Sequence, residues 1–197
     1  DLFRIISSNT KNIGLSGFYN DGFGHDGSYH YTSIVTGRKV SRDIKFLDTI
    51  RRINNGDRRF QYSRKANQTY IDGFLNIINI LKKNNANLIL YFPPFANSVN
   101  ELLANKSVKY SYIPHLKSEL TKHNIDFYDY SDVSLLGACD CEFIDGFHPG
   151  DIVNMRILKD LSSKVSYLEK YINFSYINNA ILNYAGNTYV PNPNITT

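Results

Sequence analysis

The sequence predicts an α/β fold with a parallel sheet. Two amphipathic helix patterns, 67–83 and 108–123, are each followed by a short apolar run, at 88–92 and 125–130. A continuous apolar run after an amphipathic helix is typical of a buried parallel strand. Hydrophobic residues make up 42% of the 197 residues, which is enough for the core of one domain.

Residues 1–66 are expected to form a loop-rich insert and a linking helix. Residues 9–42 are rich in Gly, Ser, Tyr and Asn and contain several turn sequences. Tyr29 and Tyr31 lie in this segment, and its amphipathic composition fits a loop that contacts a ligand. The same composition fits a short hairpin stabilised by its own tyrosines, so both interpretations stay open.

Two helices are expected before the first parallel strand. The linking helix should span Ser41 to Asn54, with Gly56 closing it. Its inward residues should be Ile44, Leu47 and Ile50, with Phe46 or Ile53 as a further candidate. The second helix, 67–83, has Asn67 as its cap. Its apolar positions follow the i, i+3, i+4, i+7 spacing and are Ile71, Phe74, Leu75, Ile78 and Leu81.

The carboxyl end of the first parallel strand is a candidate ligand site. Pro93 and Pro94 cannot donate hydrogen bonds to a sheet, so the strand must stop there. Ligands of open α/β sheets collect at the carboxyl ends of strands. Asn97 is therefore a candidate substrate-binding residue, and the competing interpretation is that it caps a helix.

The turn at 143–150 carries the candidate catalytic residues. Asp145 precedes His148 by three residues, and Gly146 relaxes the backbone between them. An aspartate at this spacing can hold one ring nitrogen of the histidine, so that the other nitrogen accepts a proton from a nucleophile. The same motif also fits a purely structural turn.

The chain after this turn is expected to be mostly helical. A helix should run from Asp151 to about Ser163, and Tyr167 to Tyr184 should continue as a second, aromatic-rich helix. The extended tail then covers 187–197. We expect residues 166–197 to pack outside the α/β domain.

Cys139 and Cys141 suggest a metal site as a rival chemistry for the turn. Together with Asp145 and His148 they would offer four potential zinc ligands. One residue between the two thiols is fewer than structural zinc sites use, so we expect no metal. A disulfide between them would close a very small ring, so two free thiols are the prediction.

These features resemble the SGNH (GDSL-type) hydrolases. The block 145–149, Asp-Gly-Phe-His-Pro, is similar to the Asp-x-x-His-Pro block near the C-terminus of that family. The run 87–94 ends in Pro-Pro and resembles the family's fourth strand, and 125–129 resembles its fifth. The resemblance covers roughly residues 67–165. It implies a three-layer α/β/α flavodoxin-like fold, in which Asp145 and His148 complete a triad with a serine and no cofactor is needed.

The serine of that triad has no match in this chain. The family's Gly-Asp-Ser block normally precedes the fourth strand, and it does not occur between Asp1 and Ala86. We therefore expect the chain to be the C-terminal part of a longer protein, with the serine outside it. The long polar insert looks most like the acyl-transfer branch of the family, which implies a location in the cell envelope, outside the cytoplasm.

The sequence thus favours a serine-dependent esterase or O-acyltransferase that acts on an acylated carbohydrate or cell-envelope polymer. The alternative is a non-catalytic module that binds such a polymer through its tyrosine-rich insert. The net charge of +4 comes from scattered Lys and Arg without a nucleic-acid motif, so nucleic acid is not an expected partner. No apolar run approaches membrane-spanning length, and nothing in the sequence indicates an oligomeric state.

Overall fold

The N-terminal part of the chain contains a small antiparallel sheet. The computed structural model describes residues 12–13, 21–24, 29–31 and 43–190. The chain divides into two compact units, 1–44 and 45–197, and each is described by itself. In the first unit the strands lie in the order β1, β2, β3 and pair antiparallel, and their bounds are Asn12–Ile13, Asp21–Gly24 and Tyr29–Tyr31. The antiparallel pairing of β2 with β3 is compatible with the hairpin interpretation of this segment, and a ligand contact by Tyr29 and Tyr31 stays a prediction.

The second unit is mainly helical, with two short pairs of strands. The α-helices are α3 (Leu47–Asn55), α4 (Gln68–Lys83), α5 (Asn97–Asn105), α6 (Tyr112–Lys122), α7 (Asp151–Lys164) and α8 (Phe174–Tyr184). The 3-10 helices are η2 (Ile44–Phe46), η3 (Arg58–Phe60), η4 (Ser134–Leu136), η5 (Asp140–Glu142) and η6 (Ser166–Tyr171). The strands are β4 (Tyr91–Phe92), β5 (Tyr128–Asp129), β6 (Phe143–Asp145) and β7 (His148–Pro149).

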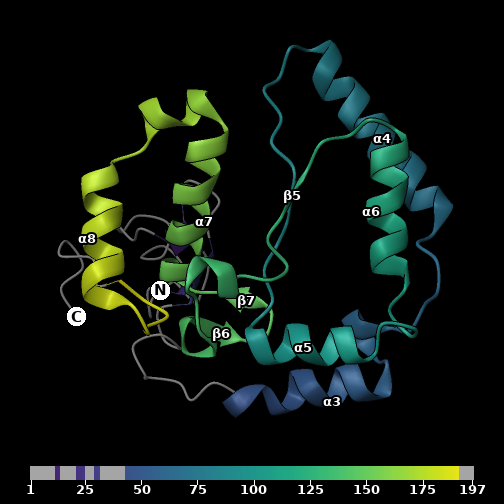
Figure 1. Cartoon of the computed structure of the whole chain (residues 1–197), viewed down its shortest axis with the longest axis horizontal. Coiled ribbons are helices and arrows are strands. Elements are labelled where there is room, and N and C mark those ends of the chain that lie inside the picture. The colour runs from purple at the N-terminus through teal and green to yellow at the C-terminus, as the bar shows by residue number, and fades with distance from the viewer. Residues whose placement is uncertain (1–11, 14–20, 25–28, 32–42, 191–197) are drawn as a thin grey trace, which may run out of the picture. The chain divides into compact units, whose positions relative to one another are not determined.

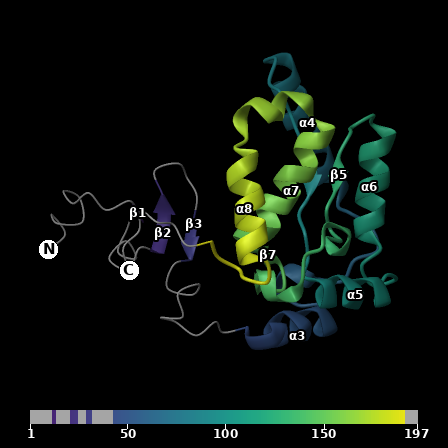
Figure 2. The ribbon, with the colours of Figure 1, turned by 60° about the vertical axis from the view of Figure 1, so that its left-hand side comes forward.

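The predicted parallel pairing is confirmed. β4 pairs with β5 in parallel, with Tyr91 opposite Tyr128. After the two prolines the pairing resumes briefly, because Phe95 bridges Asp132 in the same direction. Helices α4 and α6 lie on one side of this strand pair, and α7 and α8 lie on the other (Figures 1 and 2). The second unit is therefore a mixed α/β structure with helices on both sides of its parallel strands.

The core of this unit forms on both sides of the strand pair. The larger cluster joins α3, α5, β5, the β6–β7 hairpin and α7, through Ile53, Val99, Tyr130, Phe143, Val153 and Ile157 among others. A smaller cluster joins α4 and α6 to the strands, and its buried residues are Ile78, Leu120 and Ile125. A third, of Ile152, Ala180 and Val190, joins α7 to α8 and the chain after it. Tyr91 is still 47% exposed, so the prediction of a fully buried strand was wrong for β4.

Helix α4 matches its prediction closely, while the linking helix does not. Asn67 caps α4 by accepting a hydrogen bond from the backbone N–H of Thr69 at 2.9 Å. The linking helix α3 begins at Leu47 rather than Ser41, because Lys45 and Phe46 have left-handed backbone angles that no α-helix continues through. Phe46 is buried as a result, and Leu47, predicted inward, is 64% exposed.

The predicted helices 108–123 and 167–184 are each shorter than expected. Helix α6 begins at Tyr112, since Tyr110 is buried and its hydroxyl lies 2.8 Å from the Ile53 carbonyl and 2.9 Å from that of Phe60. The region after α7 is a 3-10 helix followed by α8, rather than one helix. Asn173 separates them, because its side chain caps α8 by accepting from the backbone N–H of Tyr176.

The close packing of Gly146 gives a stability prediction. A Cβ at Gly146 would lie 2.5 Å from Cγ2 of the buried Val99 and 3.1 Å from Cγ2 of Thr49. Gly146→Ala should therefore lower the free energy of unfolding by about 1–3 kcal/mol, measured by urea unfolding. The matched control is Gly73→Ala in α4, where the new Cβ meets no atom within 4 Å and should stabilise the helix by about 0.5–1 kcal/mol. Equal effects of the two changes would contradict this account of the packing.

Candidate active site

The Asp-His turn is a two-stranded hairpin joined to the end of β4. β6 and β7 pair antiparallel, with Asp145 opposite His148, and they lie near the beginning of α5 and α7 (Figure 1). The backbone N–H of Ala96, just before α5, donates to the Gly146 carbonyl at 3.0 Å. This bond connects the hairpin to the segment that follows the carboxyl end of β4, where α/β folds gather their ligand sites.

Asp145 holds the imidazole of His148 with both carboxylate oxygens. Nδ1 of His148 lies 2.8 Å from Oδ2 and 3.0 Å from Oδ1. The same Oδ1 accepts the backbone N–H of His148 at 2.8 Å and that of Phe147 at 3.1 Å. With Asp145 ionised, Nδ1 carries the proton of the neutral ring and donates it, and Nε2 is then the acceptor. This is the orientation that a general base requires.

The environment favours an ionised Asp145. Burial of this carboxyl raises its pKa, but the hydrogen bond and charge of His148, together with the two backbone N–H groups, lower it by more. The pKa of Asp145 therefore lies below its ordinary value. The His148 side chain is 36% exposed and that of Asp145 is 21% exposed, so the imidazole is the member of the pair that solvent reaches more easily.

Phe147 anchors the tip of the hairpin. Its ring packs edge-on against Phe60 at 5.7 Å between centroids, and the Arg59 guanidinium lies 5.8 Å from its centre. The ring also contacts the imidazole of His148, at 4.3 Å between centroids. Packing of Phe147 against Phe60 and His148 restricts how far the hairpin can tilt.

A buried ion pair between Glu142 and Arg156 lies next to the hairpin. The sequence analysis did not predict it. Glu142 is 1% exposed, and its Oε1 accepts from Nη2 of Arg156 at 3.1 Å and from the backbone N–H of Gly186 at 2.9 Å. Arg156 also donates to the Leu136 carbonyl. Glu142 thus connects the hairpin to α7 and to the turn after α8. No local pattern marks it, because its partners lie far away in the sequence.

The other predicted site residues are placed differently. Asn97 is the first residue of α5, Ala96 takes the cap position, and the cap interpretation of Asn97 was wrong. The Asn97 amide donates to the Ala138 carbonyl at 3.0 Å, and its Oδ1 is buried without a hydrogen-bond partner in the part of the chain that the structure describes. Tyr29 and Tyr31 lie in β3 of the other unit, and their side chains fall outside the described residues.

The prediction of two free thiols was wrong, because Cys139 and Cys141 form a disulfide. The prediction rested on the very small ring that a disulfide between them would close. The backbone turns into η5 directly after Cys139, which brings the two Cα atoms to 5.3 Å, within the range that disulfides use. The sulfurs are bonded to each other and do not serve as thiolate ligands. No group of three or more His, Cys, Asp or Glu residues suited to a metal occurs among the described residues.

None of the described helices combines the length and apolar character needed to cross a membrane.

Comparisons of the chain with protein-family models, with curated proteins and with solved structures found no match.

The lowered pKa of Asp145 predicts a pH-dependent contribution to stability. A carboxyl whose pKa is lower in the folded chain stabilises it above the unfolded value of about 3.9, and this contribution is lost as the pH falls through the folded pKa. The difference in unfolding free energy between the natural chain and Asp145→Asn should thus be largest above about pH 4 and shrink towards pH 2. Urea unfolding across this pH range measures it, and a difference that does not vary with pH would contradict the assignment.

Proposed function

We propose that this chain carries the Asp-His part of a Ser-His-Asp site, in a serine-dependent esterase or O-acyltransferase that acts on an acylated carbohydrate or cell-envelope polymer outside the cytoplasm. The observation that carries the proposal is the contact of both Asp145 oxygens with Nδ1 of His148. The triad needs this contact, because it fixes the ring and stabilises the imidazolium that forms during the reaction.

The proposed reaction has two stages. In the first, the serine hydroxyl attacks the acyl carbonyl while Nε2 of His148 takes its proton, and the proton then passes to the leaving oxygen. In the second, His148 takes a proton from water or from a sugar hydroxyl, and the oxygen of that molecule attacks the acyl-serine. The bond between the acyl carbon and the serine oxygen breaks, and the proton on Nε2 returns to the serine. Asp145 remains ionised throughout. The serine and the donors that stabilise the tetrahedral oxyanion come from outside the described residues.

The position of the hairpin supports this proposal. We propose that β4 and β5 belong to a three-layer, flavodoxin-like parallel sheet, with α4 and α6 in one outer layer and α7 and α8 in the other. In such a sheet, substrates bind outside the carboxyl ends of the strands. Asp145 and His148 lie on a hairpin that is hydrogen-bonded to the segment following β4, so a substrate at that edge would be within reach of Nε2.

The proposal predicts that His148→Ala abolishes catalysis without unfolding the protein. In the full-length native protein, hydrolysis of 4-nitrophenyl acetate should fall by about 10⁴-fold or more, with only a small change in Tm because the imidazole is partly exposed. His123→Ala is the matched control, since His123 is an exposed histidine at the end of α6, and it should retain full activity.

Fluorophosphonate labelling of the same protein tests the nucleophile. The reagent should modify one serine, and His148→Ala should greatly slow the labelling because the serine loses its base. Hydrolysis and labelling that survive in the His148→Ala variant would show that the hairpin is structural and would overturn the proposed function.

A further inference from the structure

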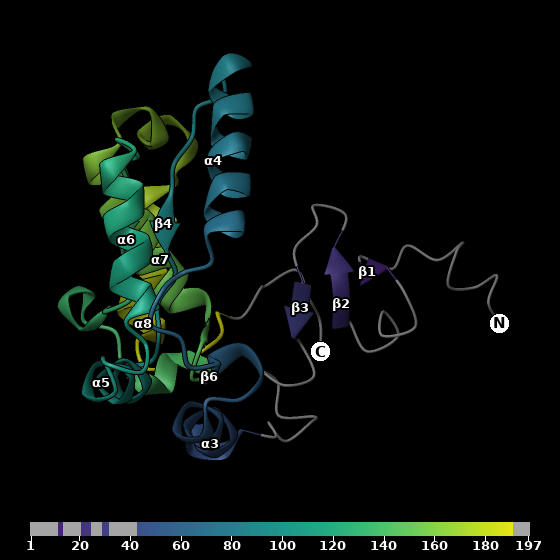
Figure 3. The ribbon, with the colours of Figure 1, turned by 90° about the vertical axis from the view of Figure 1, so that its right-hand side faces the viewer.

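Two neighbouring segments of the second unit carry basic residues and no acidic ones. Residues 58–65 lead from α3 to α4 (Figure 3), and residues 106–111 join α5 to α6. Their basic residues are Arg58, Arg59, Arg64, Lys65, Lys106 and Lys109, and neither segment contains Asp or Glu. The whole chain has a net charge of only +4, so the rest of the chain is slightly acidic. The net positive charge is therefore concentrated in these two segments.

The two segments lie side by side. The backbone N–H of Ser63 donates to the Lys109 carbonyl at 3.0 Å, and the Ser111 hydroxyl donates to the Arg64 carbonyl at 3.1 Å. The Lys109 ammonium also lies 4.4 Å from the centre of the Tyr62 ring. All six basic residues are at least partly exposed to solvent. We call these six residues the basic strip.

The basic strip has no carboxylate partner in the part of the chain that the structure describes. No ion pair there joins any of its six residues to Asp or Glu. The preceding pair Arg51 and Arg52 differs, because Asp48 binds both of them and Asp57 binds Arg51. The described residues therefore neutralise the arginines of α3 and leave the charges of the strip to be paired by another molecule.

One end of the strip lies beside the Asp-His hairpin. The Arg59 guanidinium lies 5.8 Å from the centre of the Phe147 ring. That ring lies 4.3 Å from the imidazole of His148, measured between centroids. An anionic group bound by Arg59 would thus lie one aromatic ring away from the imidazole.

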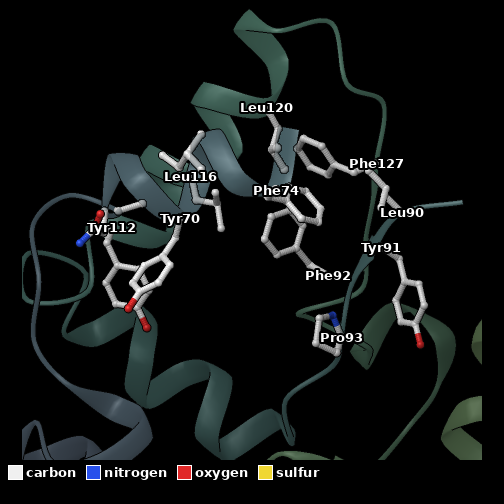
Figure 4. Close-up of a pocket in the computed structure, with 13 residues that line it drawn as sticks. Tyr70, Phe74, Leu90, Tyr91, Phe92, Pro93, Tyr112, Leu116, Leu120 and Phe127 are labelled. Atoms are coloured by element: carbon white, nitrogen blue, oxygen red, sulfur yellow. The ribbon is translucent and has the colours of Figure 1, made fainter. Parts of the chain in front are cut away.

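The other end of the strip meets an apolar cavity. Residues 66 and 67, directly after the strip, line a cavity of about 430 Å³ between α4, α6 and β4. None of the lining residues is charged, and Figure 4 shows Tyr70, Phe74, Phe92 and Tyr112 among them. An anion bound along the strip would find no cation in this cavity, so the site ends with the strip.

We propose that the basic strip binds the negatively charged polymer on which the site acts, an inference that rests on the proposed function. Carboxylate or phosphate groups along the polymer pair with the guanidinium and ammonium groups of the strip, and Arg59 holds the unit nearest the imidazole. Each pairing releases counterions, so a row of cations binds a polyanion far more tightly than one cation binds a single anion. Among the polymers that the proposed function allows, the strip selects those that carry such groups.

The aromatic residues beside the strip make nucleic acid a poor fit. Single-stranded nucleic acids bind basic grooves partly by stacking their bases on aromatic rings. Here the rings of Tyr62 and Tyr112 both pack against the buried Tyr110, at 5.4 and 6.3 Å between centroids, and Lys109 lies over Tyr62. These rings offer little open face to a base, whereas a polysaccharide or a polyol phosphate needs only the cations.

The first test measures how polymers without acyl groups bind to the full-length native protein. Fluorescence anisotropy gives Kd for labelled polygalacturonate, which carries carboxylates, for labelled poly(glycerol phosphate), and for labelled neutral dextran. At least one of the two charged polymers should bind at least tenfold more tightly than dextran, and its Kd should rise steeply with salt concentration. The charged polymer that binds more tightly shows whether the strip takes carboxylate or phosphate.

The second test maps the site with two double variants. Arg58→Gln with Arg59→Gln removes the charges beside the hairpin, and Arg64→Gln with Lys65→Gln removes those at the other end. Each double variant should raise Kd about tenfold and should reduce the slope of log Kd against log salt, because fewer polymer charges are neutralised. A change in folding alone would not alter this slope in both variants.

The matched control is Lys82→Gln with Lys83→Gln. These two exposed lysines end α4, lie outside the strip and remove the same charge as either double variant. The control should leave both Kd and the salt slope unchanged. An equal weakening by the control would mean that the polymer responds only to the overall charge of the chain, and would overturn the proposal.

Two further results would overturn it. One is binding of neither charged polymer more tightly than dextran. The other is displacement of the labelled polymer by an oligothymidylate of equal charge at a lower concentration than the unlabelled polymer needs, which would assign the strip to nucleic acid. In both cases hydrolysis of 4-nitrophenyl acetate would persist. Failure of the proposed function would instead leave the polymer bound and that hydrolysis absent.

Discussion

The close approach of Gly146 to α3 and α5 is the constraint on which the candidate site depends. Its carbonyl accepts from Ala96, and its missing side chain leaves room for Val99 and Thr49. A larger residue would push the hairpin away from the end of β4. Because Asp145 directly precedes Gly146 and His148 follows two residues later, the same contact that completes the core also sets where the imidazole lies relative to the strand ends.

The parts of the structure that sequence predicted are those with local causes. Helix α4 has its cap, its apolar spacing and its C-terminal lysines within one segment, so its bounds could be predicted closely. Asp145 and His148 are three residues apart on a turn, and their contact needs no distant partner. The parallel direction of β4 and β5 follows from the helical segments that separate them.

The parts that were missed depend on distant contacts. Helix α3 starts late because Phe46 turns inward to meet the core, and α6 starts late because the Tyr110 hydroxyl bonds to carbonyls near residues 53 and 60. The disulfide depends on the turn of the backbone into η5 directly after Cys139. The spacing of the two cysteines in the sequence does not predict that turn. The contacts of Glu142 require α7 and the turn at Gly186 to be in place.

Residues 186, 188 and 190 hydrogen-bond to the chain on both sides of the hairpin. These contacts determine when, during synthesis, the hairpin can become fixed. Gly186 donates to Glu142, Thr188 accepts from the N–H of Asp151, and Val190 donates to the Asp151 carboxylate. All three contacts join the hairpin region to chain that the ribosome makes several tens of residues later. At a synthesis rate of about 5–20 residues per second, these contacts can form only a few seconds after the hairpin has been made. A nascent chain would therefore hold Asp145 and His148 loosely until this later stretch has left the exit tunnel.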